Sequence, residues 1–571
     1  MNMKKMWVFV AVFVLAAALF AGCDKKEDGG SAGVPLGDGG ASARAEGDGA
    51  AGGDAFGSLD AQADPVTVTR TALGMEVKLT AHPIQSDGTQ AALVVDYELT
   101  SDLPEGVRSL ALYHFLSVDE VTEYGPASIR LFDLPSQTAW IELPQESNQY
   151  QDAGAFRVMP DKDGKPGYTA SSVLSPDRPF ASSVTLYAAP EGLDTVDVFL
   201  PVFGVIPDVP IVNADGGLGP FTELTGAPAA GSEAACTVTL RRFLADYEGE
   251  MFVVDEGEEA TLTITSDVLF ATDEYELTAE AQEVIARAVE QIKAEYDSGT
   301  VKVVGHTDDV ADDAYNQTLS EKRAESVRAE LAPLLGSGYT LTAEGRGETE
   351  PLAEGTSAEA RAVNRRVDIV MSGVKHEDKA EAFQAGDLLP ADYPTGQGGA
   401  DWLEYRQAGE DTNVGTTVFK VRVENLVRTE NGLVGYLRIG LAEDGTLPGL
   451  TKALYMVYAD RATSRDLAAR GYVLMQNMIG TFPVALLTAE GRLYGYDYVA
   501  TDAGTGENYV NMVCNSGTGF GPTYGDLHEG VLVPMIWPDP GTDTVTIDVD
   551  GVFRIENVPV SDDASLLAAA Y

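Results

Sequence analysis

The sequence predicts a multidomain α+β protein, in which a central β-α-β-α-β-β two-layer sandwich is flanked by two related antiparallel β-sandwich domains. Three observations predict this. At 571 residues the chain is too long for a single hydrophobic core. Short alternating apolar runs separated by turn residues occupy two long stretches. Between these stretches lies a segment whose apolar residues recur with helical spacing.

The charge of the chain restricts its partners. There are 89 Asp and Glu residues against 38 Lys and Arg residues, which gives a formal net charge of −51. Such a surface repels phosphate backbones, so nucleic acid is excluded as an expected partner. Anionic lipid headgroups repel it as well, and membrane attachment therefore requires a covalent link.

The first residues have the build of an export signal. Lys4 and Lys5 precede an apolar run over residues 6–21, which is short for a membrane span and ends in small residues. The run closes as Phe20-Ala21-Gly22-Cys23, which resembles the bacterial lipobox, with Phe where Leu is more usual. The resemblance implies cleavage before Cys23 and a lipid on its thiol. The alternative is an uncleaved anchor, and either way the remainder lies outside the cytoplasm.

Two further cysteines and a tether follow. Residues 23–64 are mostly Gly, Ala and Asp, a composition that cannot form a core and predicts a disordered leash. Besides Cys23, only Cys236 and Cys514 occur in the chain. In an oxidising compartment they can form a disulfide joining the two β domains, but geometry decides this and the sequence does not.

The two β regions resemble each other in sequence. The run Asp194-Thr195-Val196-Asp197-Val198 aligns with Asp543-Thr544-Val545-Thr546-Ile547, 349 positions later. Further matches follow in the same order at nearly constant offset, which predicts a duplication. The alternative is coincidence, since all β-sandwich strands share an alternating pattern.

The middle segment is expected to form strands and helices in turn. Thr278 can cap the first helix, which runs to Ile292 with its apolar residues on one face. The second helix is expected over residues 316–335, with Leu319, Val327, Leu331 and Leu334 in its apolar stripe. The expected strands are Thr261–Ile264, Val301–Val304, Tyr339–Ala343 and Arg366–Val370.

Three blocks of this segment carry a specific resemblance. They are Gly305-His306-Thr307-Asp308, the run from Tyr315 to Ala324, and Asn364-Arg365-Arg366-Val367. In this order they resemble the signature blocks of the OmpA-like peptidoglycan-binding family. Val268-Leu269-Phe270 and Leu277-Thr278 are similar to its opening strand and helix. The resemblance covers residues 258–373 and says nothing about either β region.

The family's ligand is the diaminopimelate of the peptidoglycan stem, which presents an ammonium and a carboxylate on one carbon. The resemblance implies that Asp308 binds the ammonium and Arg323 the carboxylate. The planar guanidinium suits bidentate carboxylate binding, and amides at the helix N-terminus can donate to further carboxylate oxygens. The acidic loop 309–313 departs from the family. It either strengthens attraction for cations or binds a metal.

The resemblance also implies secondary roles. Thr307 and Asn316 are expected as additional donors, and Arg365 or Arg366 as lining of the same pocket. His306 is expected to support the loop rather than bind ligand.

Motifs for catalysis are missing from the sequence. None of the five His residues stands in an HExxH or paired-ligand spacing, which argues against a zinc hydrolase. Cys514-Asn515-Ser516-Gly517 lacks the leading Gly of a nucleophile elbow. We therefore expect no enzyme activity, no cofactor and no metal site.

These observations predict a lipid-anchored envelope protein that tethers a membrane, by expectation the outer membrane facing the periplasm, to peptidoglycan. One alternative is a surface adhesion module whose β domains recognise a protein or glycan. A weaker alternative is a wall-cleaving enzyme. The expected segments are a signal peptide (1–22), the tether (23–64), β-sandwich copy 1 (65–245), the OmpA-like domain (258–373), a linker (374–399) and β-sandwich copy 2 (400–562).

Overall fold

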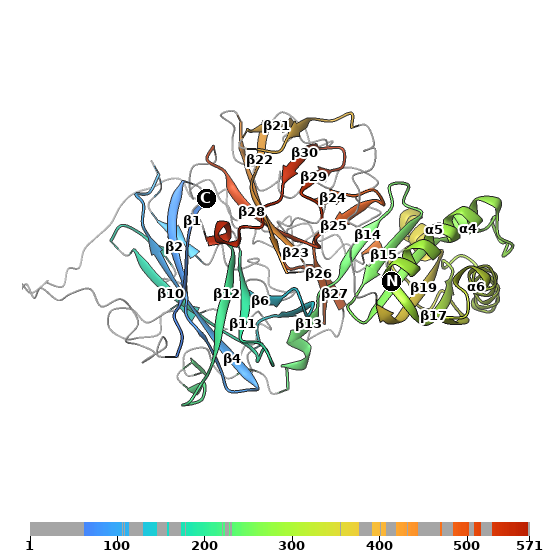
Figure 1. The fold of residues 1–571 in the computed structure, drawn as a ribbon, viewed down its shortest axis with the longest axis horizontal. Helices are drawn as coiled ribbons and strands as arrows, with labels where there is room; N and C mark the ends of the chain where they lie inside the picture. Colours follow the sequence, from blue (N-terminus) through green and yellow to red (C-terminus); the bar gives the residue numbers. More distant parts are fainter. Residues whose placement is uncertain are drawn as a thin grey trace, which may run out of the picture. The chain divides into compact units, whose positions relative to one another are not determined.

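A computed structural model describes most of residues 62–568 (Figure 1). The predicted signal peptide, Cys23 and nearly all of the tether lie outside the described residues. Among the described residues, no helix is both long and apolar enough to cross a membrane. The longest gaps in the description are 113–128, 145–156, 159–172, 376–390, 407–417, 443–468, 471–483, 502–507 and 515–527.

The first β region forms an 11-stranded sheet and a two-stranded β5–β9 pair. The main path runs β1-β2-β4-β3-β12-β11-β6-β7-β13, and β10 pairs with β4 and β8. Only β3 and β12 pair in parallel within this sheet. Its elements are β1 (Val66–Ala72), β2 (Met75–Ala81), β3 (Ile84–Ser86), β4 (Gln90–Leu99), β5 (Leu110–Ala111), β6 (Arg130–Asp133), β7 (Thr138–Trp140), β8 (Arg157–Val158), β9 (Val173–Leu174), β10 (Phe180–Ala188), β11 (Thr195–Leu200), β12 (Gly204–Asn213), the 3-10 helix η2 (Ala234–Cys236) and β13 (Thr237–Thr239).

The second β region contributes to three sheets. A four-stranded sheet runs β21-β22-β23-β28, β26 pairs with β27, and β25-β24-β29-β30-β20 forms one end of a second 11-stranded sheet. Its elements are β20 (Thr395–Gln397), β21 (Leu403–Arg406), β22 (Val418–Thr429), β23 (Gly432–Leu441), β24 (Ala485–Leu487), β25 (Arg492–Tyr494), β26 (Asp497–Thr501), β27 (Asn508–Met512), β28 (Val531–Trp537), β29 (Thr544–Val549), β30 (Phe553–Pro559) and the 3-10 helix η3 (Ala564–Ala568).

Strand pairing repeats between the two β regions. In β11–β12, Thr195 pairs with Pro210, and 349 positions later Thr544 pairs with Pro559 in β29–β30. Both hairpins carry a register shift after the second strand residue. Each also has a left-handed residue at the matching position, Asp208 with φ 53° and Asn557 with φ 54°. The same fold feature therefore recurs at the offset seen in the sequence, which supports the predicted duplication.

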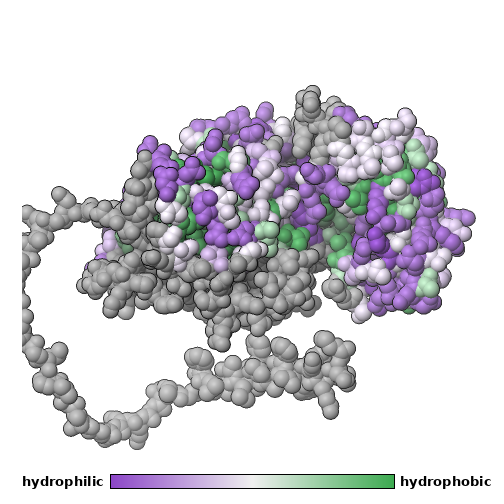
Figure 2. Space-filling model, turned by 90° about the horizontal axis from the view of Figure 1, so that it is seen from below, coloured by the Kyte–Doolittle hydropathy of each residue, from purple (hydrophilic) through white to green (hydrophobic). Residues whose placement is uncertain are grey.

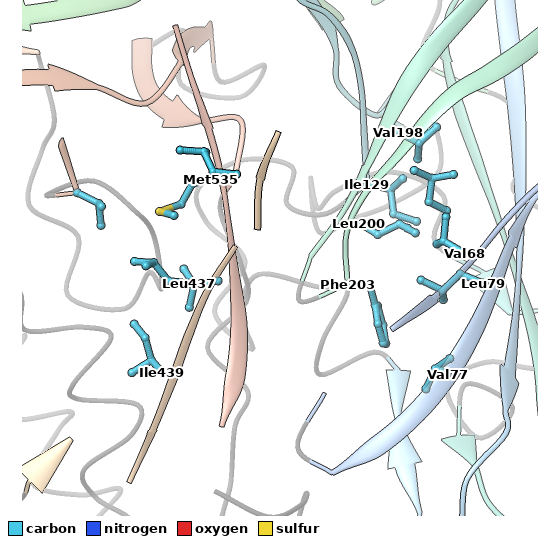
Figure 3. Packing of buried hydrophobic residues seen from close by; sticks show 14 of the residues in the cluster. Val68, Val77, Leu79, Ile129, Val198, Leu200, Phe203, Leu437, Ile439 and Met535 are labelled. Carbon is cyan, nitrogen blue, oxygen red and sulfur yellow. The ribbon is translucent and has the colours of Figure 1, made fainter. Parts of the chain in front are cut away.

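Buried residues of the two β regions share hydrophobic clusters. One cluster contains Val68, Leu79 and Val198 of the first region together with Leu437 and Met535 of the second (Figure 3). A second cluster also draws on both regions. Hydrophilic residues, by contrast, cover much of the described surface (Figure 2), as the net charge of −51 requires.

The middle segment has its own core, formed between its sheet and its two long helices. Its strands lie in the order β18-β17-β19-β16-β15-β14, with β17 and β18 parallel. Its elements are β14 (Arg242–Ala245), β15 (Met251–Asp255), β16 (Glu259–Thr265), α4 (Ser266–Leu269), α5 (Ala279–Glu295), β17 (Tyr296–His306), α6 (Asp313–Leu335), β18 (Tyr339–Gly347), α7 (Ala358–Asn364) and β19 (Arg366–Lys375).

The two long helices begin at side-chain caps. The Thr278 hydroxyl accepts a hydrogen bond from the Ala281 amide, which confirms the predicted start of α5. Asp312 caps α6 by accepting from the Tyr315 amide, so this helix begins before the predicted Asn316.

The middle segment differs from the expectations in four respects. Residues 266–269 form one helical turn rather than an opening strand, and α7 was not predicted. Leu334 is 40% exposed, because the buried stripe of α6 continues at four-residue steps from Leu331 to Leu335. Arg242–Ala245, expected in copy 1, pairs with β15 and with β25 of the second β region.

Candidate functional site

Two glycines bring helix α6 close to the sheet. Gly305 of β17 and Gly345 of β18 are paired across the parallel strands. A Cβ atom at Gly305 would collide with the carbonyl oxygen of Ser320, and one at Gly345 with the amide of Glu321. The first signature block therefore needs its glycine so that α6, which carries Arg323, can pack against the strand that leads to Asp308.

The loop after β17 is fixed by Asn316. Its Nδ2 donates to the Asp308 carbonyl oxygen at 3.1 Å and to a Glu348 carboxylate oxygen at 2.6 Å. The side chain is 2% exposed. These contacts show that Asn316 positions the loop, and its role as a secondary ligand donor stays a prediction.

The Asp308 carboxylate faces an arginine. Its Oδ2 lies 3.0 Å from Nη1 of Arg365, and its Oδ1 accepts a hydrogen bond from the Val310 amide at 3.3 Å. Arg365 also binds Asp267 through two hydrogen bonds of 3.0 and 2.7 Å. These carboxylates raise the pKa of Arg365, with Asp267 the larger cause. Arg365 is thus held between two carboxylates, and its role in lining a ligand pocket stays a prediction.

Arg323 is held by its Nε and by a ring. Its Nε donates to the Glu274 carbonyl oxygen at 2.9 Å, and its guanidinium carbon lies 5.1 Å from the centre of the Phe270 ring. The residue is 5% exposed. No described residue accepts a hydrogen bond from either Nη atom, and neither is among the fully buried unpaired atoms. The fork of Arg323 is therefore available to an external carboxylate.

The electrostatics link Arg323 to the Asp308 pair. Burial lowers the pKa of Arg323, while the charges of Asp267, Asp273 and Tyr315 oppose that shift. The nearby charge of Arg365 lowers the pKa further. Arg365 therefore pairs with Asp308, and among the described residues no ion pair joins Asp308 to Arg323.

Arg366 belongs to a different network. Its Nε donates to Asp368 at 3.0 Å, and its Nη2 donates to the Glu350 carbonyl oxygen at 3.2 Å. The same Asp368 lies 3.2 Å from Nε2 of His306. Burial alone would raise the pKa of Asp368, but Arg366 and His306 hold it below its ordinary value. Within the described residues Arg366 therefore lies away from Asp308, whereas His306 supports the strand end as expected.

Thr307 is buried, and its hydroxyl makes no hydrogen bond within the described residues. It is 5% exposed, and its amide donates to the Gly347 carbonyl oxygen at 2.9 Å. Its Oγ1 has no hydrogen-bond partner among the described residues. The hydroxyl next to Asp308 thus remains a candidate secondary donor.

The acidic loop uses its carboxylates within the protein. Asp309 binds Arg361 at 2.6 Å, which lowers the pKa of the Asp309 carboxyl, and Asp312 caps α6. No group of three or more potential metal-ligating side chains occurs among the described residues. The metal alternative for this loop therefore gains no support.

Sequence reasoning missed Asp267, Glu274 and Phe270. Asp267 is 98 residues from its partner Arg365, and Glu274 contributes only a main-chain oxygen. Neither has a motif that could have revealed it. Phe270 was part of a quoted block, but its stacking on Arg323 could not be foreseen without the helical turn α4.

The two remaining cysteines are not paired. Cys236 and Cys514 are both buried free thiols in one hydrophobic cluster. Burial raises the pKa of Cys236 to about 12 and that of Cys514 further. The predicted disulfide is therefore absent from the structure, and apolar packing accounts for both side chains.

Known proteins resemble the middle segment. Residues 269–365 match the OmpA family. Outer membrane protein A of Bordetella avium is 36% identical over 114 residues, 20% of this chain and 58% of that protein. The outer-membrane lipoprotein YfiB of Pseudomonas aeruginosa is 33% identical over 117 residues, 20% of this chain and 68% of that protein.

Coverage of the relatives is partial. Outer membrane porin F of Pseudomonas aeruginosa is 42% identical over 103 residues, yet the chain spans only 29% of it. Among solved structures, the cell wall anchor of the T6SS from Pseudomonas aeruginosa is 36% identical. That match covers 22% of this chain and 87% of the other, with a TM-score of 0.20.

Proposed function

The chain belongs to the OmpA family, and from that membership we propose that it binds peptidoglycan non-covalently through residues 258–373. One observation carries the proposal. Arg323 is buried and fixed by its Nε, while both of its Nη atoms lack an acceptor among the described residues. A cation held in this way, with no hydrogen-bonded anion among the described residues, suits a ligand carboxylate.

The ligand proposed for this site is diaminopimelate in the peptide stem. Its carboxylate would bind the Arg323 fork, and its ammonium would bind Asp308 beside Arg365. The unpaired Thr307 hydroxyl next to Asp308 supports a third polar contact. Because Arg365 already neutralises part of the Asp308 charge, a ligand carrying only an ammonium gains little binding free energy from Asp308.

The choice of stem residue gives the test. The full chain should co-sediment with sacculi whose stems contain diaminopimelate. It should bind sacculi with lysine at that position at least about tenfold more weakly, since lysine lacks the second carboxylate. Equal retention on both would contradict the proposed ligand, and retention on neither would contradict peptidoglycan binding.

We further propose that Cys23 carries a lipid and that the chain tethers the outer membrane to the wall from the periplasmic side. The support is the lipobox-like order of residues 20–23 together with a relative that is itself named an outer-membrane lipoprotein. The relatives reported above are named as membrane proteins and lipoproteins, and we propose no catalytic activity.

A further inference from the structure

Exposed apolar side chains gather beside the candidate site. Four large hydrophobic residues are conspicuously exposed in the described part of the chain, namely Tyr275, Val310, Tyr315 and Leu334. All four belong to the middle segment, although it is the smaller part of the protein. Tyr275 lies near Arg323, and Val310 and Tyr315 lie near Asp308, while Leu334 lies at the far end of α6. Exposed apolar groups concentrated in one place indicate a binding surface.

Tyr315 lies beside the loop that carries Asp308. It lies in the first turn of α6, where its amide donates to the capping Asp312, and the residue is 43% exposed. The next residue, Asn316, donates to the Asp308 carbonyl oxygen at 3.1 Å. The ring therefore lies at the surface near Asp308 rather than packed into the core.

Tyr275 lies beside Arg323. Its carbonyl oxygen accepts a hydrogen bond from Ser326 at 2.7 Å, and the preceding residue, Glu274, accepts from Arg323. The Lys322 ammonium lies 4.7 Å from the centre of its ring. The side chain is 39% exposed. A ring whose main chain is anchored in this way has little conformational entropy to lose on binding a ligand.

The third apolar group lies beside the anion. Val310 is 66% exposed, and its amide donates to the Asp308 carboxylate at 3.3 Å. No packing contact requires an apolar residue at so exposed a position. Together Tyr275, Val310 and Tyr315 form what we call the apolar rim.

The charge around the apolar rim selects its occupant. Asp273 and Glu276 are exposed next to Tyr275, and Asp309 and Asp313 are exposed next to Val310 and Tyr315. Free carboxylates of a peptide stem would be repelled here. The sugars of peptidoglycan carry no free charge where the stem is attached, and their C–H faces and acetyl methyl groups can pack on tyrosine rings.

We propose that the apolar rim binds the neutral N-acetylated sugar rings of peptidoglycan next to the stem. This inference rests on the proposed function and assigns a second part of the ligand to the same site. Asp308 and Arg323 would bind the charged end of the stem, and the apolar rim would bind the glycan strand.

The test compares two soluble ligands by calorimetric titration of the full chain in detergent. One is the disaccharide GlcNAc-MurNAc carrying the tripeptide L-Ala-D-Glu-diaminopimelate, and the other is the tripeptide alone. The native chain should bind the disaccharide form roughly five- to twentyfold more tightly. The double variant Tyr275→Ala/Tyr315→Ala should lose most of this preference, with the Kd for the free tripeptide changed less than about twofold.

Leu334→Ala is the matched control, since it truncates an equally exposed apolar side chain away from the site and should preserve the preference. Thermal unfolding of each variant shows whether the fold is kept. If the tyrosine variant loses equal affinity for both ligands, or if the native chain shows no preference between them, the apolar rim does not bind the glycan. Failure of the native chain to bind either ligand would overturn the proposed function itself.

Discussion

The Asp308 carboxylate is paired with Arg365, whose Nη1 lies 3.0 Å from Oδ2, and not with Arg323. Arg323 instead lies stacked on Phe270 with its fork unpaired among the described residues. A ligand of Asp308 therefore meets Arg365 as well. A single ammonium competes with Arg365 for Asp308, whereas a zwitterionic ligand supplies a carboxylate for the arginines as well.

Asp267 is expected to act as a positioning residue. In Asp267→Asn, Arg365 loses its charged bidentate partner and gains freedom of orientation, so Asp308 loses a fixed neighbour. Retention on sacculi should weaken roughly three- to tenfold, since the Asp267 side chain is largely exposed and the pair is screened. If Asp267→Asn changes retention by itself but not in an Arg365→Gln background, the two residues act as one unit. If the effects of Asp267→Asn and Arg365→Gln on retention add fully in the double variant, Asp267 does not act through Arg365.

Gly345→Ala should both destabilise the fold and weaken wall binding. The added Cβ meets the main chain of α6 at Glu321, so the helix that carries Arg323 must move. Overpacking of this kind costs about 1–3 kcal/mol. Urea unfolding measures the first effect and sacculus retention the second. Gly338→Ala is the control for loss of a glycine, because its φ is ordinary and its Cβ would make only van der Waals contact, 3.7 Å from the Asp297 carbonyl oxygen. Unchanged stability in Gly345→Ala would contradict the close approach.

A pH-dependent contribution is expected from Asp197 in the first β region. Burial raises the pKa of its carboxyl to about 7, with the charges of Asp208 and Asp133 adding to the shift. In the folded state it keeps a proton that the unfolded chain has lost above pH 3.8, so its stabilising contribution is present below that pH and is lost as the pH rises through 7.

Asp197→Asn should therefore be more stable than the native chain at pH 8, by roughly 1 kcal/mol once solvent screening of a partly exposed group is allowed for. The difference should shrink towards pH 4. The equivalent position of the second hairpin, Thr546, is uncharged, so Thr546→Ser is the matched control without pH dependence. Thermal unfolding at several pH values measures both. A difference independent of pH would contradict the shifted pKa.

Lipid attachment is tested at Cys23. Cys23→Ser should abolish labelling of the protein by a clickable fatty acid and release it from membranes, because the strongly acidic chain has no attraction of its own for anionic lipid. Cys236→Ser is the control, since its thiol is buried and should not be modified. Labelling retained in Cys23→Ser would rule out the proposed anchor.

Local patterns predicted much of the middle domain. The cap at Thr278, the two long helices and the strands around Asp308 follow from helical spacing and short apolar runs, and the structure has them all. Side-chain direction at the edge of the domain was less predictable. Arg365 and Arg366 are neighbours in sequence, yet they point to different partners because β19 starts between them and successive strand residues face opposite sides.

Contacts between residues far apart in the chain could not be predicted from the sequence. Asp267 and Arg365 meet only because α4 and the start of β19 lie side by side, and no spacing rule encodes that contact. The placement of β14 was missed for the same reason, since a four-residue strand can join either neighbouring sheet. In the β regions, equal offsets between matching runs predicted hairpins whose register and bulge recur, while the functions of these regions were not indicated.

Wall binding through Asp308 and Arg323 is tested most directly by co-sedimentation of the full chain with diaminopimelate-containing sacculi. The experiment compares Asp308→Ala and Arg323→Ala with the native protein. Each substitution removes a charge-assisted contact worth on the order of 1.5–3 kcal/mol, so retention should fall roughly ten- to hundredfold. The double variant should lose less than the sum, because both groups hold one ligand residue. His306→Ala should matter less than either.

Glu325→Ala and Arg328→Ala are the matched controls, because this exposed ion pair of α6 has no assigned ligand contact. Circular dichroism shows that each variant is folded. Both controls should pellet like the native chain, while folded Asp308→Ala and Arg323→Ala should stay largely in the supernatant. If these two pellet as well as the native protein, the wall-binding site assigned to Asp308 and Arg323 is wrong.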